Sequence, residues 1–285
     1  MYNLFYIIFY SLMQVIYSES VLKPEIIQYR FNDINELIRM DMSNLRDTVY
    51  TLNEYYVEVN LTTQKAILHS RNSPGLQFGI SSGTKKIEDG METKPGLFVV
   101  QSMMPEWYSQ QFDSTLMLKW IGFNYGIGFH ALQSNGYYKY LGVKPSSHGC
   151  LRVSREDANL LYDLLKPGSP VLVHNGNNAI VVAFADSNRI YTRTGFSEFR
   201  SLMKRRLEEL YAGIYFLSPK PKLLIDRSNI PHSGIDIGDS GLIPKRQLIE
   251  PVHLYISAVI PARRDAERIE YSVFSESPFR FVVGK

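Results

Sequence analysis

Alternation of apolar and polar residues begins at Tyr55 and constrains this chain more than any other feature. Val57, Val59 and Leu61 alternate with polar residues, and after a polar turn the apolar pattern resumes at 66–68. A period of two on both sides of a short turn is typical of a β-hairpin with one buried face. Further short apolar runs, separated by glycine and proline turns, lie at 76–81, 97–102, 170–174 and 179–184. The middle of the chain is therefore predicted to be mainly β.

Helical periodicity appears on both sides of this region and once within it. Apolar residues between Phe31 and Leu52 fall at a loose helical spacing, and those from Phe199 to Leu210 form one face of an amphipathic helix. Ser154 precedes an acidic turn and an apolar stripe that ends at Pro167, the pattern of a capped helix. Two strand-like runs follow near the C-terminus, at 254–259 and 279–283.

These patterns divide the 285 residues into four segments. Residues 1–20 resemble a leader, 21–53 are predicted to be helical, 54–186 form the main β domain, and 187–285 are an accessory region of unknown role. The whole is expected to be mainly β, with N-terminal helices and a C-terminal α+β extension.

The leader predicts export. Residues 4–17 are mostly apolar and small residues follow at Ser18 and Ser20, as in a secretory signal peptide. The segment contains no lysine or arginine, so an uncleaved N-terminal anchor with membrane association is the alternative. We expect the protein in the periplasm or cell envelope.

Charge and cysteine content narrow the functional classes. The net charge of +3 is spread over many residues of both signs, which argues against a nucleic-acid partner. Cys150 is the one cysteine in the chain, so no intramolecular disulfide can form. A lone thiol in an exported protein is exposed to oxidation unless it is buried or required for function.

The residues around Cys150 favour a functional thiol. The string from Ser147 to Arg152 reads Ser-His-Gly-Cys-Leu-Arg, and His130 lies 20 positions before the cysteine. A neighbouring imidazole can take the proton of a thiol and make it a nucleophile. Gly149 lets backbone N–H groups approach a reacting carbonyl. The pattern indicates acyl transfer.

This pattern resembles the L,D-transpeptidase (YkuD-type) catalytic domain. That family has a histidine, about 14 to 17 residues, and then Ser/Thr-His-Gly-Cys followed by an apolar residue and Asn or Arg. The strings Ser81-Ser82-Gly83 and Thr93-Lys94-Pro95-Gly96 also resemble its Ser-x-Gly and Thr-Pro-x-Gly elements, with the proline displaced by one. The resemblance covers roughly Tyr55 to His174 and implies a curved β-sandwich of mixed sheets with a helix after Cys150.

The resemblance implies a role for each motif residue. Cys150 would be the nucleophile and His130 its general base, oriented by the carbonyl of Ala131, where the family commonly has glycine. The expected oxyanion-hole and orienting residues are Ser147, His148 and Gly149, with the N–H of Cys150. The expected substrate-binding residues are Arg152, Trp120 and Tyr125.

The family's reaction is peptidoglycan L,D-transpeptidation, which uses stem peptides as donor and acceptor and requires no cofactor or metal. The thiolate attacks a stem tetrapeptide at the L-centre of diaminopimelate, releases D-alanine, and passes the acyl group to an amine. The amine belongs to a second stem, which gives a 3-3 cross-link, or to an envelope protein. Such a protein would serve cell-wall organisation and cell shape.

Three alternatives remain open at this stage. The same thioester could be hydrolysed, as in an L,D-carboxypeptidase. The domain could be a non-catalytic cell-wall-binding module. A zinc site is a third reading, because Cys and His are zinc ligands, but a closed structural site needs four ligands and no second cysteine is present.

Overall fold

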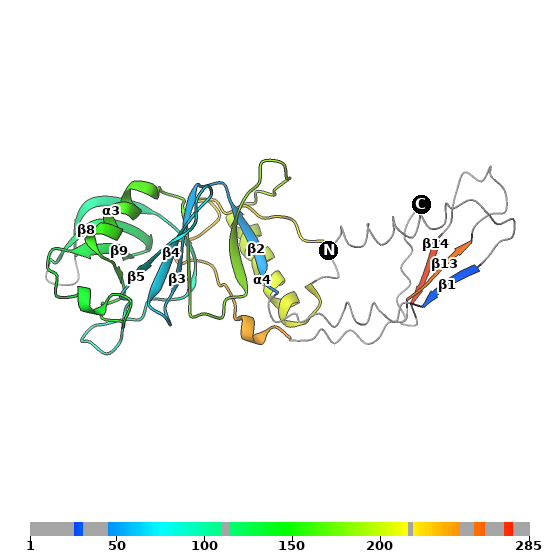
Figure 1. The fold of residues 1–285 in the computed structure, drawn as a ribbon, viewed down its shortest axis with the longest axis horizontal. Coiled ribbons are helices and arrows are strands. Elements are labelled where there is room, and N and C mark those ends of the chain that lie inside the picture. Colours follow the sequence, from blue (N-terminus) through cyan, green and yellow to red (C-terminus); the bar gives the residue numbers. More distant parts are fainter. Residues whose placement is uncertain are drawn as a thin grey trace. The chain divides into compact units, whose positions relative to one another are not determined.

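The computed structural model describes residues 26–30, 45–109, 114–215, 219–244, 254–259 and 271–275. The chain forms two compact units, one made of residues 1–40 and 248–285 and the other of residues 41–247 (Figure 1). Within the described ranges no helix is long and apolar enough to cross a membrane.

The described part of the smaller unit is an antiparallel sheet. Its strands run in the order β1 (Ile26–Arg30), β13 (Leu254–Val259) and β14 (Tyr271–Ser275). The strand predicted at 254–259 is confirmed. The leader at 1–20 and the run at 279–283 lie outside the described residues.

The predicted N-terminal helical segment is wrong where the structure describes it. Residues 26–30 form β1, and β2 (Asp47–Thr51) occupies the end of the expected helix. Asp47, Val49 and Thr51 are buried in alternation, and β2 pairs in parallel with β12 (Ile180–Phe184). Pairing with a strand that is distant in the sequence therefore outweighs the weak helical spacing of residues 47–51. Residues 31–44 lie outside the described residues.

The larger unit contains a mixed sheet built around the predicted hairpin. Its order is β5 (Leu76–Gly79), β4 (Lys65–Ser70), β3 (Tyr55–Asn60), β11 (Pro170–His174) and β6 (Gly96–Val99). β3 and β4 form an antiparallel hairpin, with Val57 opposite Leu68, and β11 runs parallel to β3. The hairpin and the strands predicted at 170–174 and 179–184 are confirmed.

A second mixed sheet carries the segment around Cys150. Its order is β10 (Leu151–Arg152), β9 (Ile127–Leu132), β8 (Leu116–Asn124) and β7 (Ser102–Tyr108). β10 is parallel to β9, and the other pairs are antiparallel. The predicted helix follows as α3 (Arg155–Leu164), where the Ser154 side chain accepts a hydrogen bond from the N–H of Asp157.

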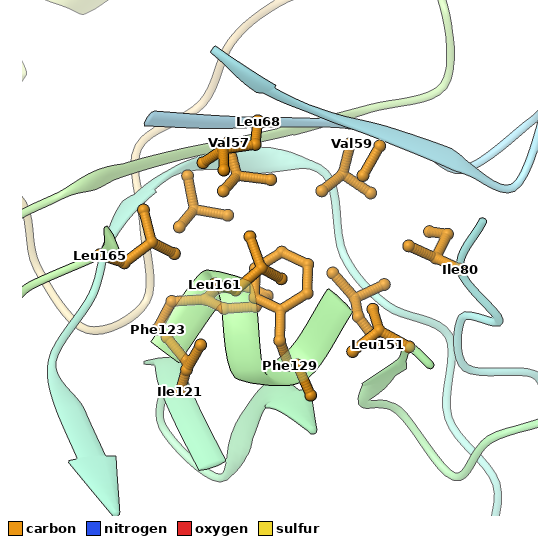
Figure 2. Packing of buried hydrophobic residues seen from close by; sticks show 14 of the residues in the cluster. Val57, Val59, Leu68, Ile80, Ile121, Phe123, Phe129, Leu151, Leu161 and Leu165 are labelled. Atoms are coloured by element: carbon orange, nitrogen blue, oxygen red, sulfur yellow. The ribbon is translucent and has the colours of Figure 1, made fainter. Parts of the chain in front are cut away.

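The main core lies between these two sheets and α3. Val57 from β3, Phe123 from β8, Phe129 from β9 and Leu161 from α3 are fully buried and point toward one another (Figure 2). The centroids of the Phe123 and Phe129 rings are 5.3 Å apart. Burial of these large apolar surfaces drives the sheets together and confirms the mainly β architecture.

A second core covers the opposite face of the first sheet. Leu97 and Leu172 of the first sheet contribute to it. Its other members come from β2, β12, α4 (Phe196–Tyr211) and the apolar residues of 223–243. Residues 187–247 thus belong to the same compact unit as the β domain. The boundary predicted at 186 does not separate two compact units, because α4 buries Phe199, Met203 and Leu207 against the β domain.

A buried ion pair joins α4 to β2. Arg206 and Asp47 are 2% and 1% exposed, and the Nη1 atom of Arg206 lies 3.1 Å from Oδ1 of Asp47. The Tyr215 hydroxyl donates to the same Oδ1 at 2.5 Å, and Arg206 also donates to the Pro221 carbonyl. Each buried charge therefore depends on the other for compensation.

We expect Asp47→Ala to lower the free energy of unfolding by about 3–5 kcal/mol, because it leaves the Arg206 guanidinium buried and unpaired. Urea denaturation measures the loss. Asp186→Ala, which removes an exposed pair with Arg189, is the control and should cost less than about 1 kcal/mol. Equal, small losses in both variants would contradict the assigned role of Asp47.

A cluster of two histidines and a glutamate lies on strands β3, β4 and β11 of the first sheet. The Nε2 atoms of His174 and His69 lie 3.1 Å and 2.9 Å from the Glu58 carboxylate. The Gly176 N–H donates to Nδ1 of His174, so the proton of that ring is on Nε2 and points at Glu58. Hydrogen bonds from His174 and His69 lower the pKa of Glu58 from 4.5 to about 2.

This shift predicts a pH-dependent stability. A carboxyl whose folded pKa is depressed stabilises the fold above its unfolded pKa and loses that contribution as the pH falls. The unfolding free energies of wild type and Glu58→Gln should therefore differ by a constant amount above about pH 4.5 and converge between pH 4.5 and about 2. Denaturant titrations across this range test it, with the exposed Glu88→Gln as matched control. A difference that stays constant down to pH 2 would contradict the pairing.

Candidate active site

Cys150 lies on a short loop between the Ser146-Ser147 segment and β10. Its Sγ atom contacts the carbonyl oxygen of Gly126, in the β8–β9 turn, at 3.7 Å. Gly149, directly before it, has a φ of +147°, and a Cβ there would lie 2.7 Å from Cδ1 of Ile127 and 2.8 Å from Cγ of Met91. Only glycine fits this conformation and this space.

His130 is held beside the cysteine loop by strand pairing. It lies on β9, and parallel pairing places Arg152 opposite His130 and Leu151 opposite Phe129. The ring is 4% exposed, and its Nδ1 lies 3.1 Å from the carbonyl oxygen of Ala131. A carbonyl only accepts, so Nδ1 carries the proton and Nε2 has a free lone pair. This is the role predicted for Ala131.

A small cavity of about 60 Å³ brings the predicted residues together. Its lining consists of Met91, Gly126, Ile127, His130, Ser147, His148, Cys150 and Arg152. The structure thus gathers five residues of the sequence motif around one space. Among the described residues, no three His, Cys, Asp or Glu side chains converge as metal ligands.

The Ser81–Gly83 segment clamps the cysteine loop from the other side. Ser81 and Arg152 exchange two backbone hydrogen bonds of 2.9 Å and 3.0 Å, and the Ser82 carbonyl accepts from the N–H of Ser147 at 3.0 Å. A Cβ on Gly83 would lie 2.5 Å from the Cα of Gly149. The two glycines are therefore in direct backbone contact, which explains the glycine of the Ser-x-Gly element.

Thr93 completes this clamp. Its hydroxyl accepts a hydrogen bond from the Gly83 N–H at 2.9 Å and donates to the Gly149 carbonyl at 2.6 Å. Thr93 is 5% exposed, so the hydroxyl satisfies two backbone groups that water reaches poorly. The Thr-Lys-Pro-Gly element thus positions the loop that carries the thiol.

Gln64 is a positioning residue that sequence reasoning missed. Its side chain is buried, its amide accepts from the Ser82 N–H at 2.9 Å, and it donates to the Ser82 hydroxyl at 2.8 Å. Its backbone φ is +54°, unusual for a residue other than glycine. In the sequence it reads as one more polar turn residue, and nothing local marks it as a support of the active site.

Burial dominates the electrostatics of the catalytic pair. It raises the pKa of the Cys150 thiol to about 11, against smaller lowering effects of a Gly128 backbone hydrogen bond and the charge of Arg152. Burial also lowers the pKa of His130 to about 4, although the Ala131 hydrogen bond opposes this. At neutral pH the resting site therefore contains a neutral thiol and a neutral imidazole.

Arg152 points its guanidinium toward the loop that precedes Cys150. Its Nη1 donates to the Ser146 carbonyl at 3.0 Å, and its Nε is buried with no hydrogen-bond partner in the described part of the chain. Burial lowers the pKa of this group. A buried N–H without a partner costs free energy and is available to a ligand oxygen.

The expected oxyanion-hole donors differ in availability. The Gly149 N–H donates to the Ser147 hydroxyl at 3.1 Å, and that hydroxyl donates to the Cys150 carbonyl at 2.5 Å. The Ser147 hydroxyl therefore contacts the loop at two points, the Gly149 N–H and the Cys150 carbonyl. In this conformation Gly149 does not offer that donor to a substrate, because a single N–H cannot fully serve two acceptors.

The predicted substrate-binding aromatics separate into two kinds. Trp120 is 5% exposed, donates from Nε1 to the Ser102 hydroxyl at 3.2 Å, and has its ring centroid 6.1 Å from that of His130. It is not among the residues that line the cavity, and its predicted contact with substrate stays a prediction. Tyr125, in contrast, is 71% exposed in the turn that contacts the thiol.

Comparison with known proteins agrees with this geometry. The family model of the L,D-transpeptidase catalytic domain, YkuD, matches residues 54–173. Residues 54–173 are thus similar to a YkuD-type domain. A search of curated proteins found no match. The match covers the motif residues from Ser81 to Arg152.

Solved structures similar to this chain include three L,D-transpeptidases. The protein from Mycobacterium smegmatis is 17% identical, with a TM-score of 0.37, over 42% of this chain and 58% of that one. The protein from Stackebrandtia nassauensis is 22% identical, with a TM-score of 0.37, over 50% and 64%. The protein from Xylanimonas cellulosilytica is 24% identical, with a TM-score of 0.36, over 43% and 61%. The chain thus covers less than two thirds of each.

The two hydrogen bonds of the Thr93 hydroxyl predict different stabilities for two substitutions at this position. Thr93→Val keeps the shape but leaves the Gly83 N–H and the Gly149 carbonyl unpaired, so the free energy of unfolding should fall by about 1–3 kcal/mol. The rate at which iodoacetamide alkylates Cys150 should also change, because the loop shifts. Thr93→Ser keeps the hydroxyl and should behave as wild type. If the valine and serine variants match in both measurements, Thr93 does not position the loop.

Proposed function

We propose that this protein is a peptidoglycan L,D-transpeptidase that uses Cys150 as nucleophile and His130 as general base. The observation that carries the proposal is the shared cavity. In it, the unprotonated Nε2 of a neutral imidazole and the only thiol of the chain line the same space. The match to the L,D-transpeptidase catalytic domain at 54–173 supports a peptidoglycan stem peptide as the substrate.

The first half-reaction transfers an acyl group to the thiol. Nε2 of His130 takes the thiol proton while Sγ attacks the carbonyl carbon at the L-centre of diaminopimelate in a stem tetrapeptide. The bond from that carbonyl to the terminal D-alanine breaks, and the imidazolium gives its proton to the departing amine. The product is a thioester on Cys150.

The second half-reaction releases the acyl group. The side-chain amine of another stem peptide, or of an envelope protein, attacks the thioester carbonyl and loses a proton to His130. The carbon–sulfur bond breaks, and the proton returns to the thiol. In both steps the N–H of Cys150 would hold the carbonyl oxygen, since that of Gly149 already donates to Ser147.

Arg152 is the best-placed group for a substrate carboxylate. It lines the cavity, and its unpartnered Nε can add a hydrogen bond when a carboxylate enters. The proposed reaction also requires stem peptides, so it requires export to the periplasm or cell envelope, consistent with the apolar leader at 1–20.

The second candidate function is hydrolysis of the same thioester. The supporting observation is the lining of the cavity, whose ionisable side chains among the described residues are His130, His148, Cys150 and Arg152, with no carboxylate to bind an amine acceptor. Water would then replace the amine, and the protein would act as an L,D-carboxypeptidase.

The pKa values of the pair predict how the free thiol reacts. Because only a thiolate is alkylated and the thiol pKa is about 11, the rate with iodoacetamide should rise about tenfold per pH unit from pH 7 to pH 10. A plateau reached near pH 5 would instead reveal a resting thiolate–imidazolium pair and contradict the neutral state. Mass spectrometry of the alkylated protein measures the rate, with Cys150→Ala as blank.

The reaction itself is tested with a disaccharide-tetrapeptide. Wild type should gain an acyl mass and release D-alanine, and Cys150→Ala should do neither. His130→Ala should acylate about 10²- to 10⁴-fold more slowly, as expected for loss of a general base. His69→Ala, a histidine outside the cavity, is the matched control. Dimeric products indicate transpeptidation, tripeptide alone indicates hydrolysis, and a folded wild type without adduct would refute both.

A further inference from the structure

The active-site cavity is too small to hold a peptide. Its volume of about 60 Å³ compares with about 300–1,000 Å³ for sites that enclose a small ligand. It admits the reacting carbonyl and few other atoms. Most of the substrate must therefore lie on the surface around the mouth of the cavity, and the side chains exposed there contact it.

Tyr125 lies in the turn between β8 and β9. It is 71% exposed, and its backbone φ of +48° is unusual for a tyrosine. The next residue, Gly126, lines the cavity and accepts the contact from Sγ of Cys150. Such conformations persist where surrounding structure enforces them, often at functional sites. Met91, which lines the cavity, is also exposed, at 46%, and adds apolar surface there.

His232 extends this surface from outside the YkuD-type domain. Its ring centroid lies 6.0 Å from that of Tyr125, with the planes inclined at 48°. His232 is exposed, and it follows the end of the family match at 173. The region predicted to be an accessory part thus supplies a side chain beside the active site.

The segment that carries His232 is firmly attached to the sheet. Ile235 and Leu97 of β6 exchange backbone hydrogen bonds of 2.8 Å and 2.9 Å. Gly234, with a φ of +74°, packs so closely that a Cβ there would lie 2.3 Å from Cε1 of Phe98. Ile230 and Ile237 are buried on either side. His232 is therefore presented from a fixed backbone, which suits a binding contact.

We propose that Tyr125 and His232 form a rim that contacts the stem peptide outside the catalytic cavity, and that His232 makes this rim specific to the present chain. The Tyr125 ring packs against the aliphatic part of the peptide, and the imidazole hydrogen-bonds to its carbonyl or carboxylate oxygens. This inference rests on the proposed function, because it takes the substrate from there.

The test compares KM and kcat for acylation by the tetrapeptide in Tyr125→Ala and His232→Ala. Each should raise KM about tenfold with little change in kcat, since a rim contact acts on binding. His232→Gln, which keeps a hydrogen-bonding group, should recover part of the loss. Tyr108→Ala removes a tyrosine that is 58% exposed on β7, at the opposite edge of the sheet from β10, and is the matched control.

Two further measurements separate this proposal from the proposed function. Iodoacetamide needs no rim, so alkylation of Cys150 should proceed at the wild-type rate in both variants, which shows that the loop is intact. Peptide binding to the Cys150→Ala chain should shift the ring NMR signals of His232 and Tyr125 whether or not turnover occurs. Unchanged KM values, or binding that leaves both rings unperturbed, would overturn the rim, whereas a wild type without acyl adduct would refute the function alone.

Discussion

The contact between Gly83 and Gly149 is the constraint on which the active site depends. A Cβ on Gly83 would lie 2.5 Å from the Cα of Gly149, so two backbones approach as closely as the chain permits. Around this contact, Ser81 bonds Arg152 in both directions and Thr93 bridges Gly83 and Gly149. These bonds fix the loop, and β10 continues directly from it into the pairing with β9. The position of the thiol relative to His130 follows from backbone hydrogen bonds more than from its own side chain.

Burial gives this site its chemical character. In a polar, solvent-exposed site a thiol and an imidazole form a thiolate–imidazolium pair more readily. Here burial disfavours both charged forms, so both groups are neutral at rest. The charge of Arg152, opposite His130 in the strand register, lowers the pKa of both groups. In a site of this kind a neutral thiol can react when its proton is transferred to the imidazole during the attack on a carbonyl.

The second core explains why the chain continues past the YkuD-type domain. α4 and the strand-like segment after it cover the face of the first sheet that the main core leaves open, with Arg206 and Asp47 compensating each other at the contact. The same segment then runs along β6 and brings His232 to Tyr125. One stretch of chain thus completes the second core and also places His232 beside Tyr125.

The sequence by itself determined the hairpin at 55–70 and the helix after Ser154, and it identified the motif residues that line one cavity, because period-two burial, a helix cap and motif spacing are local signals. It misjudged residues 47–51, where parallel pairing with β12 outweighs helical spacing. It also could not reveal the contacts of Gln64 with Ser82 and of His232 with Tyr125, or the burial of Trp120 near His130. The first two contacts join residues that lie 18 and 107 positions apart in the sequence. Only the tertiary structure decides them, since they arise when sheets pack on shared cores and bring distant strands into register.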